Sequence, residues 1–381
     1  MDIIRYLRTA SIAYRAHPVV LVRLDLNIAA RELRHSVRLK RVASTIVFLR
    51  RKGCVVVIIS HRGRPSKKEQ QLKKATRATS LKPLVGALSV ALKTKIIFEA
   101  SSDFTGVARR VRALMPGSVM LLENIRLWPE EEKNNVAFAK KIATIGDIYV
   151  NDAFAVSHRA HASVDAITRF LPSYAGFELE KEIRALDAVV HAPARPLVVV
   201  LGGVKISDKI GVIKNFWKHA DAIVTGGGVA NTILAFRGIP VGQSVFERDA
   251  LTVVRPYLGA EKLRAPIDVI TAKEGIFDIG PKTIAVYSNL LQKAKTIIWN
   301  GPMGYIEKKV YQKGTLEIGR ACARSKGFSV VGGGETTSFL FEKKLANRIS
   351  FVSTGGGAML DYLAGEKLPG IEALKKSIRQ S

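Results

Sequence analysis

The chain has 381 residues, more than one compact core usually holds, and this length suits two domains of about 150 to 200 residues each. No apolar run approaches the ~18 residues that a membrane span needs, and scattered arginines follow Asp2, so we expect neither a membrane segment nor a signal peptide. Only Cys54 and Cys322 occur, which argues against a disulfide framework and predicts a reducing, cytoplasmic location.

Charge is the unusual property of this composition. Sixty Lys and Arg residues against 32 Asp and Glu give a formal net charge of +28, and the first hundred residues hold 22 basic and 5 acidic side chains. A phosphate-rich partner such as nucleic acid would explain the excess. The simpler interpretation is a solvated basic surface, because the chain has no RNP, zinc-finger or basic-zipper pattern.

Residues 1–172 alternate apolar strand patterns with helical patterns. Strands are expected at 19–27 (VVLVRLDLN), 54–60 (CVVVIIS), 95–100 (KIIFEA), 118–124 (SVMLLEN) and 147–154 (DIYVNDAF). Strands and helices that take turns along a chain predict a doubly wound parallel sheet, whose strands are buried on both faces. We therefore interpret residues 1–172 as a first α/β domain.

A charged helix and a second series of strands follow. The helix pattern begins at Phe177 and ends before the Pro-rich stretch APARP, so residues 173–191 are interpreted as an interdomain helix. Strands are then expected within 192–365 at 197–203 (LVVVLGG), 221–228 (DAIVTGGG), 266–272 (PIDVITA), 296–304 (TIIWNGPMG), 328–335 (FSVVGGGE) and 349–357 (ISFVSTGGG). The predicted fold class is α/β, with two doubly wound, Rossmann-like parallel-sheet domains joined by this helix.

Clusters of glycine end several strands of the second half. GGG occurs at 226–228, 332–334 and 355–357, where a backbone can approach a ligand closely or turn into a helix whose N–H groups face an anion. Three such clusters at strand ends, where open α/β sheets bind ligands, favour a nucleotide site over simple turns. The chain does not complete a G-x-G-x-x-G motif, which weakens the interpretation as a dinucleotide-dependent dehydrogenase. Gly202-Gly203 with Lys205 and Lys209 does not match the Walker A motif either.

The first half of the chain has arginines, rather than glycine clusters, after its predicted strands. Each lone arginine could be a surface residue, but Arg64, Arg126 and Arg159 all follow predicted strand ends and should converge at one edge of a parallel sheet. Guanidinium groups bind phosphate and carboxylate bidentately, and Asp25 and Asn27 could hold a hydroxyl. His61, His158 and His161 are interpreted as donors to a phosphate oxygen rather than metal ligands, because no third ligand accompanies the H-x-x-H pair.

Nine blocks in this order resemble the signature blocks of the phosphoglycerate kinase family. They are VRLDLN, SHRGRP, LLENIR, VNDAF, HRAHAS, LGGVKISDK, WNGPMG, VGGGETT and STGGGA, and the resemblance extends from about Val20 to KLPGIEAL near the C-terminus. It implies reversible transfer of the acyl phosphate of 1,3-bisphosphoglycerate to ADP, giving 3-phosphoglycerate and ATP, with Mg²⁺ as cofactor. It also implies a monomer, a tail at 366–381 that returns to the first domain, and domain closure about the helix.

The resemblance assigns site residues by their position in these blocks. Binding of 3-phosphoglycerate or 1,3-bisphosphoglycerate is expected of Asp25, Asn27, Arg38, His61, Arg64, Arg126 and Arg159. The nucleotide is expected at Gly203, Lys205, Lys209, Gly227, Gly228, Asn300, Pro302, Gly304, Glu307, Gly333, Gly334, Glu335 and Thr336. Arg38, Lys205 and Lys209 are the expected catalytic residues and Glu335 the metal ligand.

The sequence departs from the family pattern at several positions. The carboxylate linked to the metal is usually aspartate, whereas this chain has Glu335, and only KEGIF at 273–277 stands where a longer loop beside the adenine is usual. Ala29 replaces a usual proline, and the HRAHAS block follows AFAVS. We also expect Lys205 at the start of a helix. A nucleic acid-binding protein on a kinase scaffold without activity is the alternative function that the charge suggests.

Overall fold

The structure is a computed structural model that describes residues 4–9, 17–28, 37–273 and 275–377. The side chains of Val37, Arg38, Lys40 and Val42 lie outside the described part. The chain folds into two compact units, Met1–Glu182 with Lys367–Ser381 and Ile183–Glu366, and the boundary between them falls within helix α7 (Phe177–Val190). The helix expected from Phe177 is therefore present.

The first unit is built on a six-stranded sheet in which every pair of neighbours is parallel. Its strand order is β3-β4-β2-β1-β5-β6. The strands are β1 (Val19–Leu24), β2 (Val55–Ile59), β3 (Ile96–Glu99), β4 (Val119–Leu122), β5 (Ile148–Asp152) and β6 (Ser173–Ala175). Strand β6 was not predicted, because three residues are too few to show a periodic pattern.

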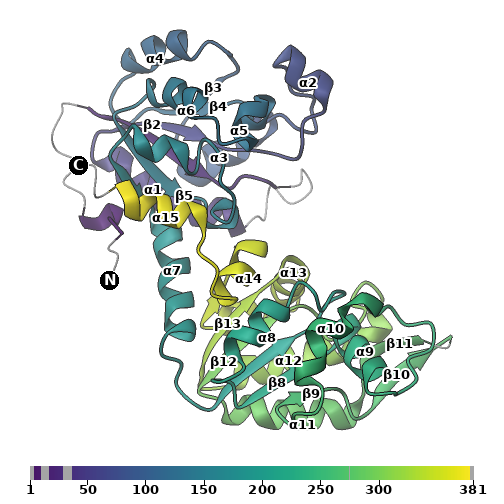
Figure 1. Ribbon diagram of the computed structural model, residues 1–381. Helices are drawn as coiled ribbons and strands as arrows, with labels where there is room; N and C mark the ends of the chain where they lie inside the picture. Colours follow the sequence, from purple (N-terminus) through teal and green to yellow (C-terminus); the bar gives the residue numbers. More distant parts are fainter. Residues whose placement is uncertain (1–3, 10–16, 29–36, 274, 378–381) are drawn as a thin grey trace. The chain divides into compact units, whose positions relative to one another are not determined.

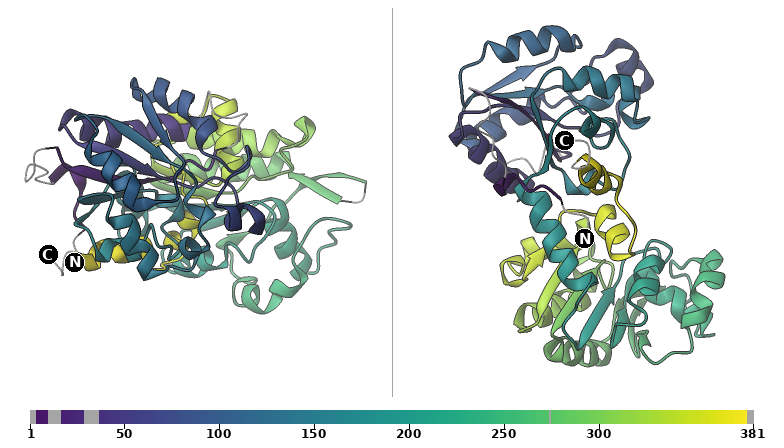
Figure 2. Two further views of the ribbon diagram at one scale, coloured as in Figure 1. Left: turned by 90° about the horizontal axis from the view of Figure 1, so that it is seen from above. Right: turned by 60° about the vertical axis from the view of Figure 1, so that its left-hand side comes forward.

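Helices cover both faces of this sheet (Figures 1 and 2). Alternate residues of β1 enter different cores. Val20 and Val22 join one cluster with α1 (Val37–Arg51) and α3 (Val85–Leu92), whereas Val19 and Leu21 join another with α4 (Phe104–Arg112) and α6 (Val136–Ala143). Burial on both faces explains why the strands read as continuous apolar runs. The helices of this unit are α1 (Val37–Arg51), α2 (Lys67–Leu72), α3 (Val85–Leu92), α4 (Phe104–Arg112), α5 (Pro129–Glu132), α6 (Val136–Ala143) and α15 (Pro369–Ser377).

Helix α15, the last element of the chain, packs on this first unit (Figure 1). The Gly370 amide donates to the carbonyl of Ser157 at 2.8 Å, and a Cβ at Gly370 would lie 2.7 Å from Cγ1 of Val164. A glycine at this position thus allows the helix to approach the loop that follows β5.

The second unit holds another six-stranded parallel sheet, of order β14-β13-β12-β7-β8-β9. Its strands are β7 (Leu197–Leu201), β8 (Ala222–Thr225), β9 (Leu263–Arg264), β12 (Thr296–Asn300), β13 (Phe328–Gly332) and β14 (Phe351–Val352). Its helices are α8 (Ile210–Phe216), α9 (Gly227–Phe236), α10 (Leu251–Val254), α11 (Pro281–Lys293), α12 (Lys313–Arg324), α13 (Gly334–Glu342) and α14 (Gly357–Leu363). Two parallel α/β sheets confirm the predicted fold class.

One predicted strand of this sheet was placed wrongly. PIDVITA forms β10 (Val269–Ala272), which pairs with β11 (Gly275–Ile279) in a separate antiparallel hairpin, and the short β9 occupies the sheet edge. Ile270 is 39% exposed, unlike the residues of a strand covered on both faces. Two antiparallel strands can be joined by a tight turn, whereas a strand that enters a parallel sheet must be reached through a longer crossover connection. The short KEGIF segment therefore favours the local hairpin.

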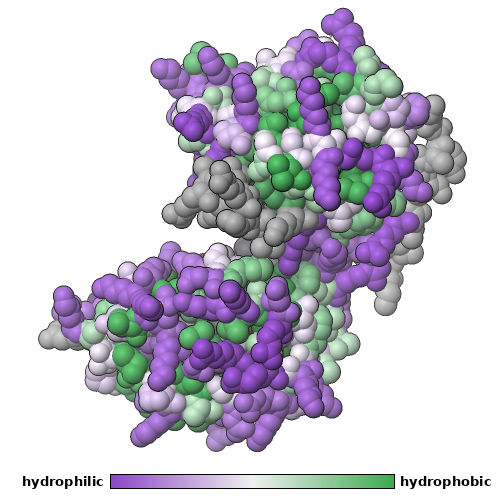
Figure 3. Space-filling view, turned by 180° about the vertical axis from the view of Figure 1, so that it is seen from behind, coloured by the Kyte–Doolittle hydropathy of each residue, from purple (hydrophilic) through white to green (hydrophobic). Residues whose placement is uncertain are grey.

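Hydrophilic side chains cover much of the face shown in Figure 3, and hydrophobic residues appear there in small groups. No helix among the described residues is long and apolar enough to cross a membrane.

A carboxylate organises the long loop that follows β2. Glu69, which is 9% exposed, accepts hydrogen bonds through Oε2 from the amide and hydroxyl of Ser66, both at 2.8 Å, in a capping box at the start of α2. Its Oε1 accepts from the Thr76 amide at 2.8 Å and from the Thr79 hydroxyl. These hydrogen bonds, that from Thr79 foremost, lower the pKa of Glu69 to about 2.

In Glu69→Gln the side-chain NH₂ group replaces one carboxylate oxygen, so donors of this loop lose their acceptor. We expect the loop to loosen, at a cost of about 1–3 kcal/mol in stability. Hydrogen exchange of the Ser66 and Thr76 amides measures this directly and should accelerate, whereas the exposed Lys68→Gln should leave both rates unchanged. Because the folded pKa lies below the unfolded value, the stabilisation by Glu69 is present above about pH 4 and is lost toward pH 2. Unchanged exchange in Glu69→Gln would contradict this role.

Candidate functional site

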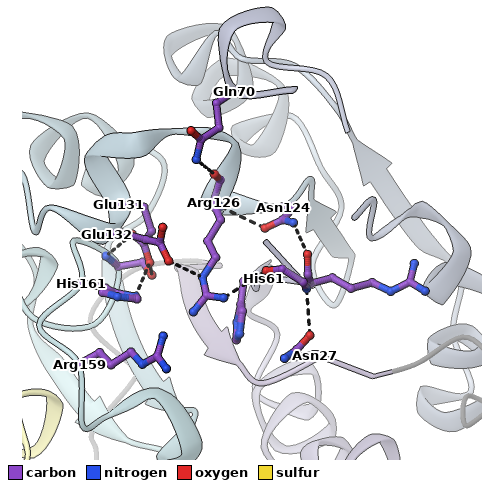
Figure 4. A network of polar contacts seen from close by, with 12 residues as sticks. Asn27, His61, Gln70, Asn124, Arg126, Glu131, Glu132, Arg159 and His161 are labelled. Carbon is purple, nitrogen blue, oxygen red and sulfur yellow. Dashed lines mark hydrogen bonds and ion pairs between the residues drawn. The ribbon is translucent and has the colours of Figure 1, made fainter. Parts of the chain in front are cut away.

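The predicted polar residues of the first unit follow the carboxyl ends of adjacent strands. Asp25 and Asn27 follow β1, His61 follows β2, Arg126 lies in the 3₁₀ turn after β4, and Arg159 lies in the loop after β5. Because the strands are parallel, these ends meet at one edge of the sheet. Of the three arginines expected to converge, Figure 4 labels Arg126 and Arg159, which lie at this edge with His61 and His161.

A chain of hydrogen bonds positions the loops at this edge. Asp25 Oδ1 accepts the Asn27 amide at 3.1 Å, and Asn27 Oδ1 accepts the Gly63 amide at 2.9 Å. Asn124, whose side chain is buried, donates to the carbonyl of Arg62 at 2.7 Å (Figure 4). The loops after β1, β2 and β4 are thus held as one structure.

The two arginines of SHRGRP have different environments. Arg62 is 7% exposed and donates to the carbonyls of Ile28, Arg77 and Ser80, so it supports the loop. Arg64 is exposed at the surface of the same loop. The sequence identified Arg64 as the ligand-binding candidate, and its exposure is compatible with that role.

Arg126 is a buried cation of the pocket. Its Nη1 donates to the carbonyl of Gly63 at 3.1 Å, and its Nε lies 3.4 Å from Oε1 of Glu132 (Figure 4). Burial lowers the pKa of Arg126, and Glu132 acts in the opposite direction. Arg159 directs its guanidinium group toward Arg126 in Figure 4, and its Nε donates to Nε2 of His158 at 3.0 Å.

The pocket histidines are neutral. Burial, with repulsion from nearby arginines, lowers the pKa of His161 to about 3 and moves the pKa of His61 far below its ordinary value. Arg126 and Arg159 both disfavour a second proton on either ring, so these four side chains lie near one another. A neutral imidazole supplies a hydrogen bond rather than a charge.

Sequence reasoning missed two charged residues beneath this pocket. Arg23 and Glu131 are both 0% exposed, and each hydrogen-bonds to the hydroxyl of Ser163, at 2.9 and 2.6 Å. The available signal was Arg23 itself, a single cation inside the apolar run VVLVRL. Arg38 lies in α1, but its side chain is outside the described part of the chain, so its predicted role stays a prediction.

The second unit forms its candidate site almost entirely from backbone. Loops after β7, β8, β12 and β13 meet at the carboxyl edge of the sheet. Gly203, Gly227 and Gly333 have φ of 87°, 58° and 98°, which favours glycine. A Cβ at Gly227 would lie 2.8 Å from the carbonyl oxygen of Gly203, and one at Gly228 would collide with that of Val204.

The loop after β12 is part of this set of glycine-rich loops, which we call the cradle. The carbonyl of Pro302 accepts the Gly203 amide at 2.9 Å. Gly304 is buried against the carboxylate of Asp278, where a Cβ would collide, and burial raises the pKa of Asp278 to about 6. Glu307 is exposed three residues further along.

Two lysines follow Gly203 in the loop after β7, and their side chains differ in exposure. Lys205 is exposed, whereas Lys209 is 8% exposed, and burial lowers the pKa of Lys209 against the opposing effect of Asp208 and Glu335. The expectation that Lys205 begins a helix was wrong. Helix α8 begins at Ile210 with Lys209 as its N-cap, because residues 202–208 form turns after β7.

Glu247, which sequence reasoning also missed, anchors the lysine loop. Its carboxylate accepts the amide of Ser207 at 2.8 Å and the Ser207 hydroxyl at 2.7 Å, between the two lysines. The Glu247 amide donates to the Thr232 hydroxyl at 3.1 Å, which itself donates to the carbonyl of Gly228. The lysine loop is thereby connected to the glycines that begin α9.

Polar atoms without partners identify the interior of the cradle. Nδ2 of Asn300 and Oγ1 of Thr336 are buried and have no hydrogen-bond partner among the residues that the structure describes. A Cβ at Gly333 would lie 3.3 Å from Asn300 Nδ2. Glu335 is exposed in the first turn of α13, and Gly334 has open space around its Cα. Unsatisfied buried donors and acceptors are costly, so they indicate a place for a polar ligand.

Within the described ranges, no group of three or more His, Cys, Asp or Glu side chains could hold a metal ion.

Comparisons with known proteins identify the family of this chain. A profile of the family described as phosphoglycerate kinase matches residues 14–366. The chain is 40% identical to phosphoglycerate kinase of Thermomicrobium roseum, with 93% of this chain and 96% of the relative covered, and 38% identical to that of Leptospira biflexa, with 93% and 95% covered.

Solved structures resemble the whole chain. Phosphoglycerate kinase of Pyrococcus horikoshii OT3 has a TM-score of 0.85 and 30% identity, covering 99% of this chain and all of that one. The enzyme of Coxiella burnetii has a TM-score of 0.83 and 33% identity, with 98% and 99% covered. This chain therefore belongs to the phosphoglycerate kinase family, and it is a glycolytic kinase that exchanges a phosphoryl group between 1,3-bisphosphoglycerate and ADP.

Proposed function

We propose that the first unit, with the sheet-edge residues after β1, β2, β4 and β5, binds 3-phosphoglycerate and 1,3-bisphosphoglycerate. The observation that carries this proposal is the cluster of Arg126, Arg159, His61 and His161 at one sheet edge, where the two arginines help to lower the pKa of both histidines. Two guanidinium groups, of buried Arg126 and half-buried Arg159, beside two neutral imidazole rings favour an anionic ligand. Asp25 and Asn27 would orient its hydroxyl, and exposed Arg64 would cover the ligand, with Arg38 included from its block in the sequence.

The second unit is proposed to bind ADP and ATP. Amides of the glycine loops and the first turn of α13 would face the phosphates, and the partnerless Asn300 and Thr336 would bind phosphate oxygens. The lysines would neutralise the phosphates, and Glu307 would reach the ribose. The complete proposed set is Gly203, Lys205, Lys209, Gly227, Gly228, Asn300, Pro302, Gly304, Glu307, Gly333, Gly334, Glu335 and Thr336.

The residues of the cradle fit Mg²⁺. Glu335 offers one exposed carboxylate beside the partnerless hydroxyl of Thr336, and Mg²⁺ in kinases is commonly held by one or two carboxylates with substrate phosphates and water. Glutamate is one methylene longer than the usual aspartate and can still reach the ion directly or through water. When bound, the ion would supply charge neutralisation at the nucleotide phosphates.

Catalysis by these residues would be positioning and electrostatic stabilisation. Phosphoryl transfer requires little covalent chemistry from the protein, because charge spreads over the equatorial oxygens of the group in transfer. Lys205, exposed on a loop held by Glu247, is proposed to bind those oxygens, and buried Lys209 to hold the nucleotide phosphate. Arg38 is the proposed cation from the first unit.

We further propose a monomeric, cytoplasmic enzyme, in keeping with the family resemblance and the absence of a disulfide framework in the sequence. The filled catalytic positions favour an active kinase over a nucleic acid-binding protein, the alternative that the charge of +28 suggested. Coupled measurement of ATP formation from 1,3-bisphosphoglycerate tests this function. Absence of ATP formation together with salt-dependent binding to duplex DNA would reverse the choice.

Arg159→Ala should weaken binding of 3-phosphoglycerate by about 10- to 100-fold, because a hydrogen bond to a charged group contributes about 1.5–3 kcal/mol. ADP affinity should not change. Calorimetric titration with each ligand makes the comparison, and Arg169→Ala, which removes an exposed arginine of the same unit, is the control. Loss of ADP binding with intact 3-phosphoglycerate affinity would exchange the roles of the two units.

Lys205→Met should lower kcat by about 10²–10³-fold, the scale seen when one preorganised donor to a developing charge is removed. The Kd for ADP should change little, because the charge that Lys205 would meet is greatest during transfer. Steady-state kinetics and ADP titration measure both quantities, and Lys214→Met on the exposed surface of α8 is the control. A raised nucleotide KM with normal kcat would instead make Lys205 a ground-state ligand.

Glu335→Gln should raise the Mg²⁺ concentration needed for half-maximal activity, because a neutral amide is a weaker ligand for a hard cation than a carboxylate. A Mg²⁺ titration of the coupled assay provides the measurement. Glu342→Gln, at the other end of α13, is the matched control. An unchanged Mg²⁺ requirement in Glu335→Gln would remove Glu335 from the proposed metal site.

A further inference from the structure

Arg23 differs from every other cation of the first unit's proposed substrate pocket. It lies within β1 rather than after it, and it is 0% exposed. Its Nε donates to Oγ of Ser163 at 2.9 Å, its Nη1 to the carbonyl of Leu24 at 2.6 Å, and its Nη2 lies 3.2 Å from Nδ1 of His61. Each of the three guanidinium nitrogens therefore has a partner inside the protein.

The partners of Arg23 are held in turn. Oγ of Ser163 donates to Oε1 of Glu131 at 2.6 Å, and the Ser163 amide donates to Oε2 of the same carboxylate at 2.8 Å. Glu131 is itself fully buried, and burial raises its pKa while Arg23 acts in the opposite direction. A guanidinium group bound on three sides and closed to solvent has one geometry, so its contact with His61 is a permanent part of the pocket.

The contact determines the protonation of the imidazole ring. A guanidinium group has donors and no acceptor, so Nδ1 of His61 has to be the unprotonated, accepting nitrogen. We propose that Arg23 is a positioning residue that keeps His61 as the neutral tautomer with its proton on Nε2. That proton lies on the opposite edge of the ring from Arg23, so His61 acts as a hydrogen-bond donor toward the substrate anion and never as a cation.

Charged groups on the surrounding elements act in the same direction. Arg23 on β1, Arg126 after β4, and Arg159 and His161 after β5 all face His61, and each disfavours a second proton on its ring. Burial at 3% exposure adds to their effect and lowers the pKa of His61 far below its ordinary value. Geometry and electrostatics therefore agree on a neutral ring.

This inference deepens the proposed function of the first unit and rests on it for the role of the substrate. A histidine with an unperturbed pKa would instead be a cation at low pH and lose its charge near pH 6.5. A neutral donor behaves differently, because its hydrogen bond does not titrate over the working range of the enzyme. The affinity of the site for its anion should therefore be the same at pH values below and above the ordinary histidine pKa, apart from changes in the ionisation of the ligand itself.

The test is a long-range ¹H–¹⁵N correlation spectrum of the wild-type protein labelled with ¹⁵N-histidine, with His61→Gln used to assign the signal. We expect one pyrrole-type and one pyridine-type nitrogen, with the connectivity of the Nε2–H tautomer, unchanged between pH 5.5 and 8. An Nδ1–H pattern, or two nitrogens that titrate together within this range, would overturn the proposal. The wild-type spectrum decides this question even where variants of buried Arg23 fail to fold.

Addition of 3-phosphoglycerate separates this inference from the proposed site. A shift of the His61 Nε2 signal on saturation supports both. A fixed Nε2–H tautomer that does not respond to 3-phosphoglycerate would leave the effect of Arg23 intact and contradict the placement of the substrate. ADP is the control ligand, and it should leave the His61 signals unchanged.

Two substitutions of His61 give an independent readout. The amide nitrogen of glutamine can take the place of Nε2, whereas the shorter asparagine cannot reach it, so His61→Gln should retain more affinity for 3-phosphoglycerate than His61→Asn. We expect His61→Asn to lose about 10- to 100-fold, the value of one hydrogen bond to a charged group. His191→Asn, at an exposed histidine, is the control. Equal losses in both His61 variants would count against donation from Nε2.

Arg23→Lys provides the converse experiment. It keeps the positive charge but shortens the side chain and loses the planar arrangement of donors, so His61 in the folded variant should exchange between its two neutral tautomers. Ionic repulsion alone would instead keep the wild-type tautomer in this variant. That result would assign the effect to charge and remove the positioning role of the hydrogen bond.

Discussion

Parallel pairing of the strands is the constraint on which both sites depend. All neighbours in each six-stranded sheet run the same way, so the carboxyl ends of the strands, and the loops that leave them, meet at one edge. Helices on both faces bury each strand and make the edge rigid. The loops that leave this frame differ between the two units: they carry cationic side chains in the first and glycine backbone in the second.

Carboxylates, two of them buried and one exposed, support the cationic edge. Arg126 has Glu132 nearby, Arg23 shares Ser163 with Glu131, and Glu69 organises the loop that carries Arg64. These acidic residues compensate repulsion between cations and hold loops by accepting backbone hydrogen bonds, so the ligand can meet preorganised donors. The neutral state of His61 belongs to the same arrangement, because a further cation there would add repulsion.

The glycine-rich edge requires close approach of backbone to backbone. The loops after β7, β8 and β12 pack closely, with the Gly203 amide donating to the carbonyl of Pro302, and a Cβ at Gly227 or Gly228 would collide with the backbone of the loop after β7. Asn300 and Thr336 are left with buried polar atoms that find no partner within the described part of the chain. Such atoms cost free energy in the unliganded protein, which is consistent with a site built for a polar ligand.

The sequence by itself determined the fold class, the family and the candidates at strand ends, because apolar runs, glycine clusters and ordered blocks are local patterns. It did not place β10 in its hairpin or α8 after Lys209, since short elements are decided by pairing and turns rather than by periodicity. Nor did it select Arg23, Glu131 or Glu247, whose roles arise from partners far away in the chain. Only the tertiary structure decided those contacts, because burial and hydrogen bonding between distant residues, not residue type, set the protonation of His61 and the position of the Lys205 loop.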